Sequence, residues 1–169
     1  MAVHKAVGLS LAILAAGCAS TVPVPDGLKP GTNETLALIA PAKGVQIYEC
    51  RGGKWAFVAP QAELFDRSGK KIGTHYAGPH WEAADGSKIA GVVKARADAP
   101  APGAIPWLLL AAKSVGTEGA FSRVTSIQRV ATVGGVAPAD ACPKDGAQAR
   151  VAYTADYYFF IAPISIKGS

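Results

Sequence analysis

The side chains best suited to chemistry in this 169-residue chain lie in one short segment, residues 75–87. The segment holds two of the chain's three histidines, His75 and His80, together with Glu82 and Asp85. Two imidazoles and a carboxylate form a ligand set that zinc or another divalent first-row metal accepts. The same groups could instead perform acid–base catalysis, because imidazole titrates near neutral pH. All four residues are therefore candidate catalytic residues, and His75, His80 and Glu82 are candidate metal ligands.

The spacing of these three candidate ligands permits them to converge but does not require it. His80 and Glu82 are two residues apart, so on a strand their side chains point to the same face. The turn signal Gly78-Pro79 could fold His75 back beside them. The spacing matches no established metal motif, however. A structural role, with the neighbouring aromatic residues in the core and the histidines bonded to backbone or water, explains the same residues.

Aromatic side chains suggest a second kind of site, which would stack a sugar or hold an apolar ligand. The ligand-binding candidates are Tyr76, Trp81 and Trp107, although aromatic residues on strands more often belong to the core. The chain lacks a dinucleotide fingerprint, a P-loop and a serine-hydrolase elbow. We therefore expect no nucleotide cofactor, and no cofactor at all other than the divalent metal considered above.

Short strands are the elements that must position these residues. Apolar stretches separated by turn signals every eight to twelve residues are typical of an antiparallel sandwich or barrel. Residues 105–113 are apolar without a period, which fits a buried strand or a helix, and we favour a strand. Residues 151–161 are partly apolar on both faces, which predicts a strand inside a sheet. The other expected strands are residues 45–50, 54–58, 61–65, 72–76, 80–82, 89–95 and 121–133. The prediction is a single all-β domain, sandwich or barrel, with at most one short helix.

The N-terminus has the pattern of a lipoprotein signal peptide. The charge-free apolar run of residues 6–16 is too short to span a bilayer, and small residues lead directly to Cys18. We expect cleavage before Cys18 and lipidation of its thiol, with an ordinary signal peptide as the alternative. A Pro- and Gly-rich stretch follows and predicts a flexible tether. The expected signal peptide, lipidated tether, β domain and C-terminal tail are residues 1–17, 18–33, 34–163 and 164–169.

Assigning Cys18 to lipid leaves Cys50 and Cys142 as an even pair. In an oxidising compartment a disulfide between them is the default, with two free thiols as the alternative. Ala19 is not the Asp that in many lipoproteins signals inner-membrane retention. In a diderm host we therefore expect an exported, lipid-anchored protein of the outer membrane that faces the periplasm.

The formal net charge of +5 is scattered along the chain, and Lys70-Lys71 is the only basic doublet. Nucleic-acid binding needs clustered Lys and Arg, so we expect no nucleic-acid partner. The expected partners are the membrane, through the lipid anchor, and a small molecule, a glycan or an envelope protein.

Several local patterns together resemble the family numbered 3455 in the domain-of-unknown-function series. The resemblance covers about residues 35–161, and it implies an exported protein of a type found in bacteria and fungi. Some fungal relatives carry a malate dehydrogenase label, which the missing nucleotide fingerprint does not support here. The family has no established activity, so no catalytic residue can be carried over. The resemblance also implies that Cys50, Cys142 and residues 75–87 are family features. The patterns are residues 44–50, 55–57, 75–82, 85–87, 105–110, 127–130, 132–138 and 153–159.

The sequence therefore predicts a non-enzymatic, lipid-anchored envelope protein that binds a small molecule, a glycan or a protein. One alternative is a metal-dependent or acid–base enzyme that uses His75, His80 and Glu82. Another alternative is a structural component of the envelope.

Overall fold

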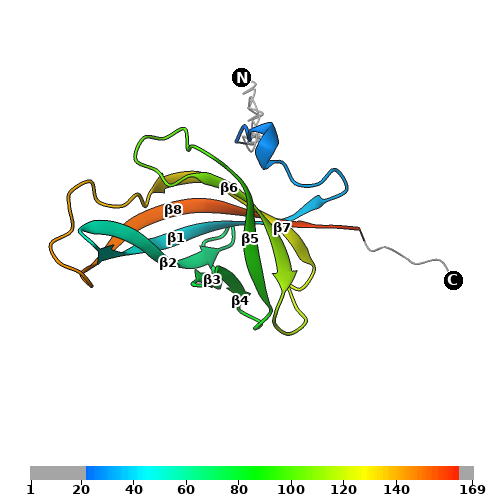
Figure 1. Ribbon diagram of the computed structural model, residues 1–169. Helices are drawn as coiled ribbons and strands as arrows, with labels where there is room; N and C mark the ends of the chain where they lie inside the picture. Colours follow the sequence, from blue (N-terminus) through cyan, green and yellow to red (C-terminus); the bar gives the residue numbers. More distant parts are fainter. Residues whose placement is uncertain (1–21, 164–169) are drawn as a thin grey trace, which may run out of the picture.

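Eight antiparallel strands close into a barrel in the computed structural model, which describes residues 22–163 (Figure 1). Each strand pairs with the next along the chain, and β8 pairs with β1 to complete the circle. The all-β prediction is confirmed, and the architecture is a barrel rather than a sandwich. The elements are η1 (Asp26–Leu28), β1 (Thr35–Arg51), β2 (Lys54–Phe65), β3 (Lys71–Tyr76), β4 (His80–Ala83), β5 (Lys88–Ala97), β6 (Trp107–Ser114), β7 (Val124–Gly134) and β8 (Gln148–Ile161).

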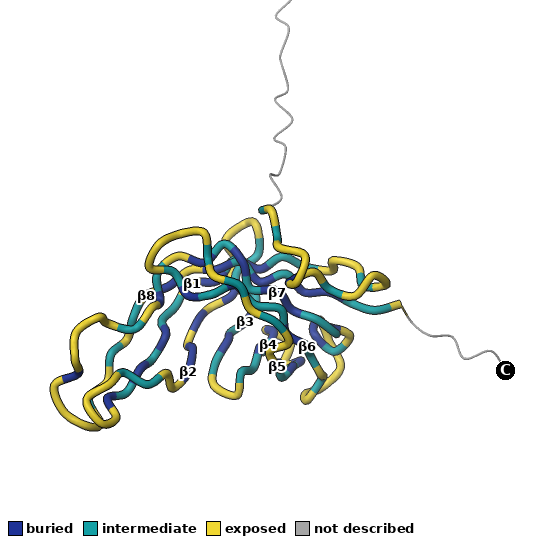
Figure 2. The backbone as a smooth tube through the Cα atoms, turned by 45° about the horizontal axis from the view of Figure 1, so that its top comes forward, coloured by how far each residue is buried: buried dark blue, intermediate teal, exposed yellow. Residues whose placement is uncertain are grey.

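The barrel core forms because alternate side chains of each strand point inward. On β8 the inward residues Tyr153, Ala155, Tyr157 and Phe159 are all at most 4% exposed. This strand pairs with β1 on one side and β7 on the other, so its predicted place inside a sheet is confirmed. Figure 2 shows the result: buried residues follow the strands, and exposed residues mark the loops that join them.

The ambiguous apolar stretch is strand β6, as favoured from the sequence. Its residues alternate between two hydrophobic cores, which explains why the run shows no polar face. Leu108 and Leu110 pack in the barrel core, whereas Trp107 and Leu109 pack in a second core on the outer surface.

This second core holds the described part of the N-terminal segment against the barrel. Leu28 is 1% exposed and packs with Trp107 and Val130, and its carbonyl accepts a hydrogen bond of 2.5 Å from Nε2 of Gln128. The expected flexible tether of residues 18–33 is therefore corrected in its described part: Val22, Val24 and Leu28 pack in the second core, and η1 contacts β5 and β6. The Pro- and Gly-rich composition suggested a free linker, but burial of Leu28 stabilises the contact of this segment with the barrel.

The predicted signal peptide, the lipidated Cys18 and the tail from residue 164 lie outside the described residues. Within residues 22–163, no helix has the length and apolar character that a bilayer crossing would need.

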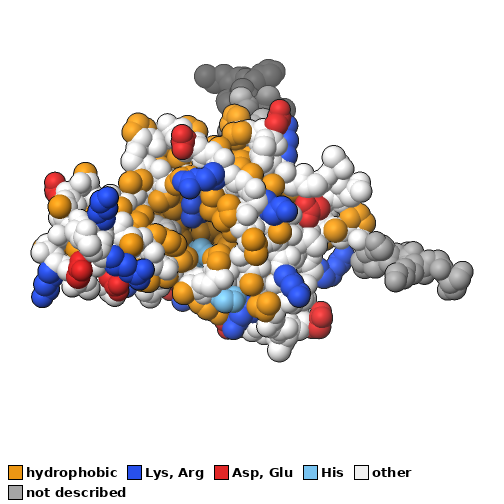
Figure 3. Space-filling view, in the orientation of Figure 1, with side chains coloured by type: hydrophobic (Ala, Val, Ile, Leu, Met, Phe, Trp, Pro, Cys, Tyr) orange, Lys and Arg blue, Asp and Glu red, His pale blue; other side chains and the backbone are white. Residues whose placement is uncertain are grey.

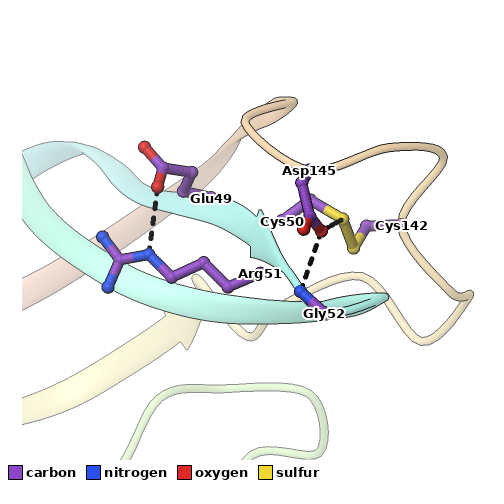
Figure 4. Close-up of polar contacts among 6 residues, drawn as sticks. All are labelled: Glu49, Cys50, Arg51, Gly52, Cys142 and Asp145. Atoms are coloured by element: carbon purple, nitrogen blue, oxygen red, sulfur yellow. Dashed lines mark hydrogen bonds and ion pairs between the residues drawn. A yellow bond between two sulfur atoms is a disulfide. The ribbon is translucent and has the colours of Figure 1, made fainter.

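The predicted disulfide between Cys50 and Cys142 is present (Figure 4). It joins the end of β1 to the loop between β7 and β8, across 92 residues of sequence. Asp145 in the same loop accepts a hydrogen bond of 2.8 Å from the backbone nitrogen of Gly52. The bridge and this hydrogen bond together fasten the long β7–β8 loop to the turn between β1 and β2.

One part of the barrel wall is low, because β3 and β4 are much shorter than their neighbours β2 and β5 (Figure 1). β2 pairs with β3 only from Ala62 onward, and β4 pairs with β5 only as far as Ala90. β2 nevertheless runs without a break through Pro60, which was expected to separate two strands. Pro60 pairs with Gln46 on β1, but β2 has no partner on its β3 side at that point, and proline is tolerated where one side of a strand is unpaired.

Candidate functional site

The β3–β4 hairpin places the predicted site residues on two opposite faces of the wall. In its register His75 is opposite Trp81, and Tyr76 is opposite His80. Residues directly opposite each other in an antiparallel pair share a face. His75 therefore points inward, whereas His80 and Glu82 point outward, and the three candidate ligands do not converge.

The outward face carries a surface cluster of paired side chains. Glu82 accepts a hydrogen bond of 2.5 Å from the hydroxyl of Tyr76 and lies 3.1 Å from Nζ of Lys88. These two partners hold the pKa of Glu82 below its ordinary value. The His80 ring stacks on Tyr76 with centroids 5.6 Å apart. Across residues 22–163, no three His, Cys, Asp or Glu side chains are arranged to hold a metal ion.

Asp85 lies in the turn between β4 and β5, away from these residues. Its Oδ1 accepts hydrogen bonds from the backbone and hydroxyl of Ser87, and its Oδ2 accepts one from the backbone nitrogen of Ala120. These bonds lower the pKa of Asp85, with the Ser87 hydroxyl as the largest cause. They tie the β4–β5 turn to the loop before β7, which gives Asp85 a structural part in the fold.

The inward face lines a cavity of about 310 Å³ in the barrel. Figure 3 shows it as a hollow lined by hydrophobic side chains, with a histidine in its depth and basic side chains near its rim. Eight-stranded barrels have an interior just wide enough for side chains or for one small ligand. Apolar walls come from β2, β5 and β6, through Phe57, Val58, Pro60, Val93, Leu108 and Leu110.

The cavity opens through the low part of the wall, which we call the side opening. It is bounded by Phe57 and Val58 on β2, by Gly78 and Pro79 in the β3–β4 turn, and by Val93 on β5. Phe57 and Val93 are 54% and 51% exposed, which is high for large apolar side chains that line the same cavity. The rim of the side opening is therefore apolar.

His75 is the buried titratable group at the centre of the cavity wall. It is 3% exposed, and its ring stacks on Trp81 with centroids 4.1 Å apart. Burial lowers the pKa of His75 to about 3, so the imidazole is neutral at ordinary pH. Its Nδ1 lies 2.8 Å from the carbonyl oxygen of His80, which can only accept, so Nδ1 carries the proton. Nε2 is consequently left as an acceptor.

Two buried donors of the cavity wall have no hydrogen-bond partner in the described structure: Nε2 of Gln46 and Nε1 of Trp81. Both side chains are at most 2% exposed. Leaving a buried donor unsatisfied costs about 1–3 kcal/mol, so native proteins rarely leave one without a purpose. Both side chains belong to the cavity lining, and the two nitrogens themselves have almost no accessible surface.

Arg129 supplies the positive charge of the cavity. It lies on β7 opposite Tyr157, and both residues line the cavity. Its Nε and Nη2 donate to the carbonyl of Pro106 at 3.2 and 2.7 Å. No carboxylate within residues 22–163 forms an ion pair with it. Burial raises the pKa of Tyr157, and the Arg129 charge acts on the phenol in the opposite direction.

The structure therefore brings two of the predicted site residues together and separates the others. Trp81 and His75 share the cavity, Tyr76 joins the surface cluster, and Trp107 lies in the second core. Sequence reasoning missed Gln46 and Arg129. The available signal was a polar side chain in the middle of a strand otherwise rich in β-branched and aromatic residues.

A sequence model of proteins of unknown function, DUF3455, matches residues 30–161. No curated protein matches the chain. No solved structure matches it either.

Proposed function

Since the chain belongs to the DUF3455 family of proteins of unknown function, its role must be inferred from its cavity, and we propose that it binds a small, largely apolar molecule with one polar end. The observation that carries this proposal is the pair of buried, unpartnered donors, Gln46 Nε2 and Trp81 Nε1, in an otherwise apolar wall. An apolar cavity with a few convergent polar groups is the usual form of a small-molecule site. The lining provides apolar contacts and hydrogen-bond donors, which suit binding of a molecule more than its chemical transformation.

The size of the cavity limits the size of the ligand. A cavity of about 150 Å³ takes one benzene molecule, so a cavity of 310 Å³ takes roughly 10–12 non-hydrogen atoms. This is the volume of a two-ring aromatic compound or of a medium-length acyl chain. A glycan of several sugars or a folded partner does not fit within it, which favours the small molecule among the expected ligands.

The side opening explains how such a molecule would reach the cavity. The exposed apolar side chains Phe57, Val58 and Val93 stand at its rim. They offer an apolar ligand a favourable contact before it is buried.

The test is a titration of the purified domain with 2-naphthol, a two-ring compound with one polar oxygen. We expect saturable 1:1 binding with a Kd on the order of 1–100 μM, as measured by calorimetry. Absence of saturable binding for 2-naphthol, 1-octanol and octanoate alike would overturn the proposal.

A blocking variant separates cavity binding from surface binding. Val93→Trp should fill the side opening and weaken 2-naphthol binding by at least about 10-fold. Val92→Trp is the matched control, because Val92 is 68% exposed and does not line the cavity. Equal affinity in both variants would place the bound compound elsewhere.

The tryptophans supply an independent reading of the same event. Trp81 and Trp107 are both buried with an unpartnered Nε1, but only Trp81 lines the cavity. We expect bound 1-octanol, which does not absorb with tryptophan, to change the emission of the wild type and of Trp107→Phe. The change should be lost in Trp81→Phe.

We also propose that the protein is exported and anchored through a lipid on Cys18, where it works as an envelope binding protein. The motif at Cys18 supports this, and so does the disulfide, since disulfides persist mainly in oxidising compartments. Cys18→Ser should release the protein from the membrane fraction. Unchanged membrane association of that variant would contradict the lipid anchor.

A further inference from the structure

We propose that the polar end of the ligand is a carboxylate bound by Arg129, so that the protein is a receptor for small apolar acids. This inference rests on the proposed function and deepens it. It concerns the chemical class of the ligand rather than the existence of binding.

The charge of the cavity is unbalanced. Arg129 is its cationic side chain, and the residues that line it include no Asp or Glu. Arg129 is half-buried beside largely apolar walls, and a charge in such surroundings is more favourable when it is paired. A ligand carboxylate would provide the missing counter-charge.

The guanidinium also has a geometry that suits a carboxylate. Arg129 uses the edge formed by Nε and Nη2 to hold the carbonyl of Pro106. Of its five N–H groups, both on Nη1 and one on Nη2 are not used by the Pro106 carbonyl, and the Tyr157 hydroxyl is a hydrogen-bond partner for part of this set. These groups form the end edge of the fork, which matches the two oxygens of a carboxylate. The contact to Pro106 fixes the side chain while that edge stays available.

Other hydrogen-bond donors lie in the same cavity lining as Arg129. Gln46 Nε2 and Trp81 Nε1 are further donors in the same lining, each buried and unpartnered. A carboxylate has about four lone-pair sites, so it can accept further hydrogen bonds beside those from the guanidinium. A hydroxyl oxygen has only two, and an ammonium accepts nothing.

The test compares three ligands of one carbon skeleton by calorimetry at pH 7.5: octanoate, 1-octanol and octylammonium. They carry charges of −1, 0 and +1. We expect octanoate to bind at least about 10-fold more tightly than 1-octanol, which is the effect of a charge-assisted hydrogen bond. Octylammonium should bind more weakly than 1-octanol.

Variants identify the residue responsible. Arg129→Met should bring the ratio of the 1-octanol and octanoate Kd values close to one, and this ratio separates the effect of the charge from any general change in the cavity. Arg129→Lys, which keeps the charge, should keep part of the preference. Arg150→Met is the matched control, because Arg150 is an exposed arginine that bonds Gln61 outside this cavity, and it should behave as the wild type.

The outcomes distinguish this inference from the proposed function. Equal affinities for octanoate and 1-octanol in the wild type would overturn the carboxylate proposal and leave small-molecule binding in place. A preference that survives in Arg129→Met would overturn the assignment to Arg129. Failure of all three ligands, together with 2-naphthol, would overturn the proposed function itself.

Discussion

The imidazole of His75 lies flat against the indole of Trp81, with ring planes 10° from parallel. Tyr157 meets both rings edge-on, at centroid distances of 5.2 and 5.5 Å. The three rings form one aromatic cluster in the cavity wall. They exclude water from the imidazole, and this exclusion keeps His75 neutral.

The first prediction is a loss of stability in weak acid. Burial gives His75 a folded-state pKa of about 3, against about 6.5 in the unfolded chain. As the pH falls below about 6.5 the unfolded chain binds a proton that the folded protein refuses, so the free energy of unfolding falls until about pH 3. We expect a loss of about 2 kcal/mol between pH 7.5 and pH 5, measured by urea denaturation.

His75→Phe is the control for this loss, because phenylalanine keeps a ring in the cluster and cannot take up the proton. The variant also removes the hydrogen bond to the His80 carbonyl, so its slope between pH 5 and 7 is compared rather than its absolute stability. A slope equal to that of the wild type would assign the pH effect to another group.

The second prediction concerns Gly91, which faces the indole of Trp81 from β5. A Cβ built on Gly91 would lie 2.7 Å from Trp81 Cζ3 and 3.2 Å from Leu110 Cδ2. Gly91→Ala should therefore cost about 1–3 kcal/mol of stability and weaken 2-naphthol binding, because the rigid indole must move. Gly27→Ala is the control, since its Cβ would meet nothing within 4 Å. A fully stable Gly91→Ala protein with unchanged affinity would refute this packing argument.

The third prediction tests whether the segment before β1 belongs to the domain. Leu28→Ala should lower the free energy of unfolding by about 2–4 kcal/mol, because it opens a hole in the second core. Leu36→Ala should cost less than about 1 kcal/mol, since Leu36 is 48% exposed. Similar losses of unfolding free energy for the two variants, measured by chemical denaturation, would show that the segment is a free linker.

The fourth prediction concerns the disulfide. The double variant Cys50→Ala and Cys142→Ala should lose about 2–5 kcal/mol of stability, because the bridge closes a long loop and restricts the unfolded chain. Binding of 2-naphthol should persist below the unfolding transition, since neither cysteine lines the cavity. A large loss of affinity in a still-folded variant would show that the β7–β8 loop shapes the cavity.

The strand pattern predicted the all-β fold because alternation and turn signals are local properties of a sequence. It underestimated β1, whose first ten residues contain Pro41 and Gly44, and it divided β2 at Pro60. The errors at the two prolines have one physical origin: proline weakens a strand on average, but its cost depends on which edges of that strand are paired. Pairing is a tertiary property that no local window contains. Phe121 likewise stands in a turn before β7, although its apolar character suggested the start of the strand.

The side of the sheet on which each histidine lies depends on the length of the β3–β4 turn. Three residues separate Tyr76 from His80, so these two are opposite each other and His75 is opposite Trp81. A register shifted by one residue would exchange the faces of one strand against the other. Spacing alone therefore could not decide whether His75 and His80 meet.

The cavity donors could not be grouped from sequence for a different reason. Gln46 lies on β1 and Arg129 on β7, and only closure of the barrel through β8 brings them to one lining. Each residue alone reads as a polar side chain in an apolar strand. Their shared cavity is a consequence of topology.

The length of the short β3–β4 hairpin affects access to the cavity more than it affects packing of the barrel core. Since the present pairings of β3 and β4 already complete the ring, two more residues on each hairpin strand would raise the wall across the side opening while the core stayed as it is. The length of the hairpin thus sets the size of the side opening. A designer, or a lineage under selection, could widen or seal the entrance by insertion and deletion without repacking the interior.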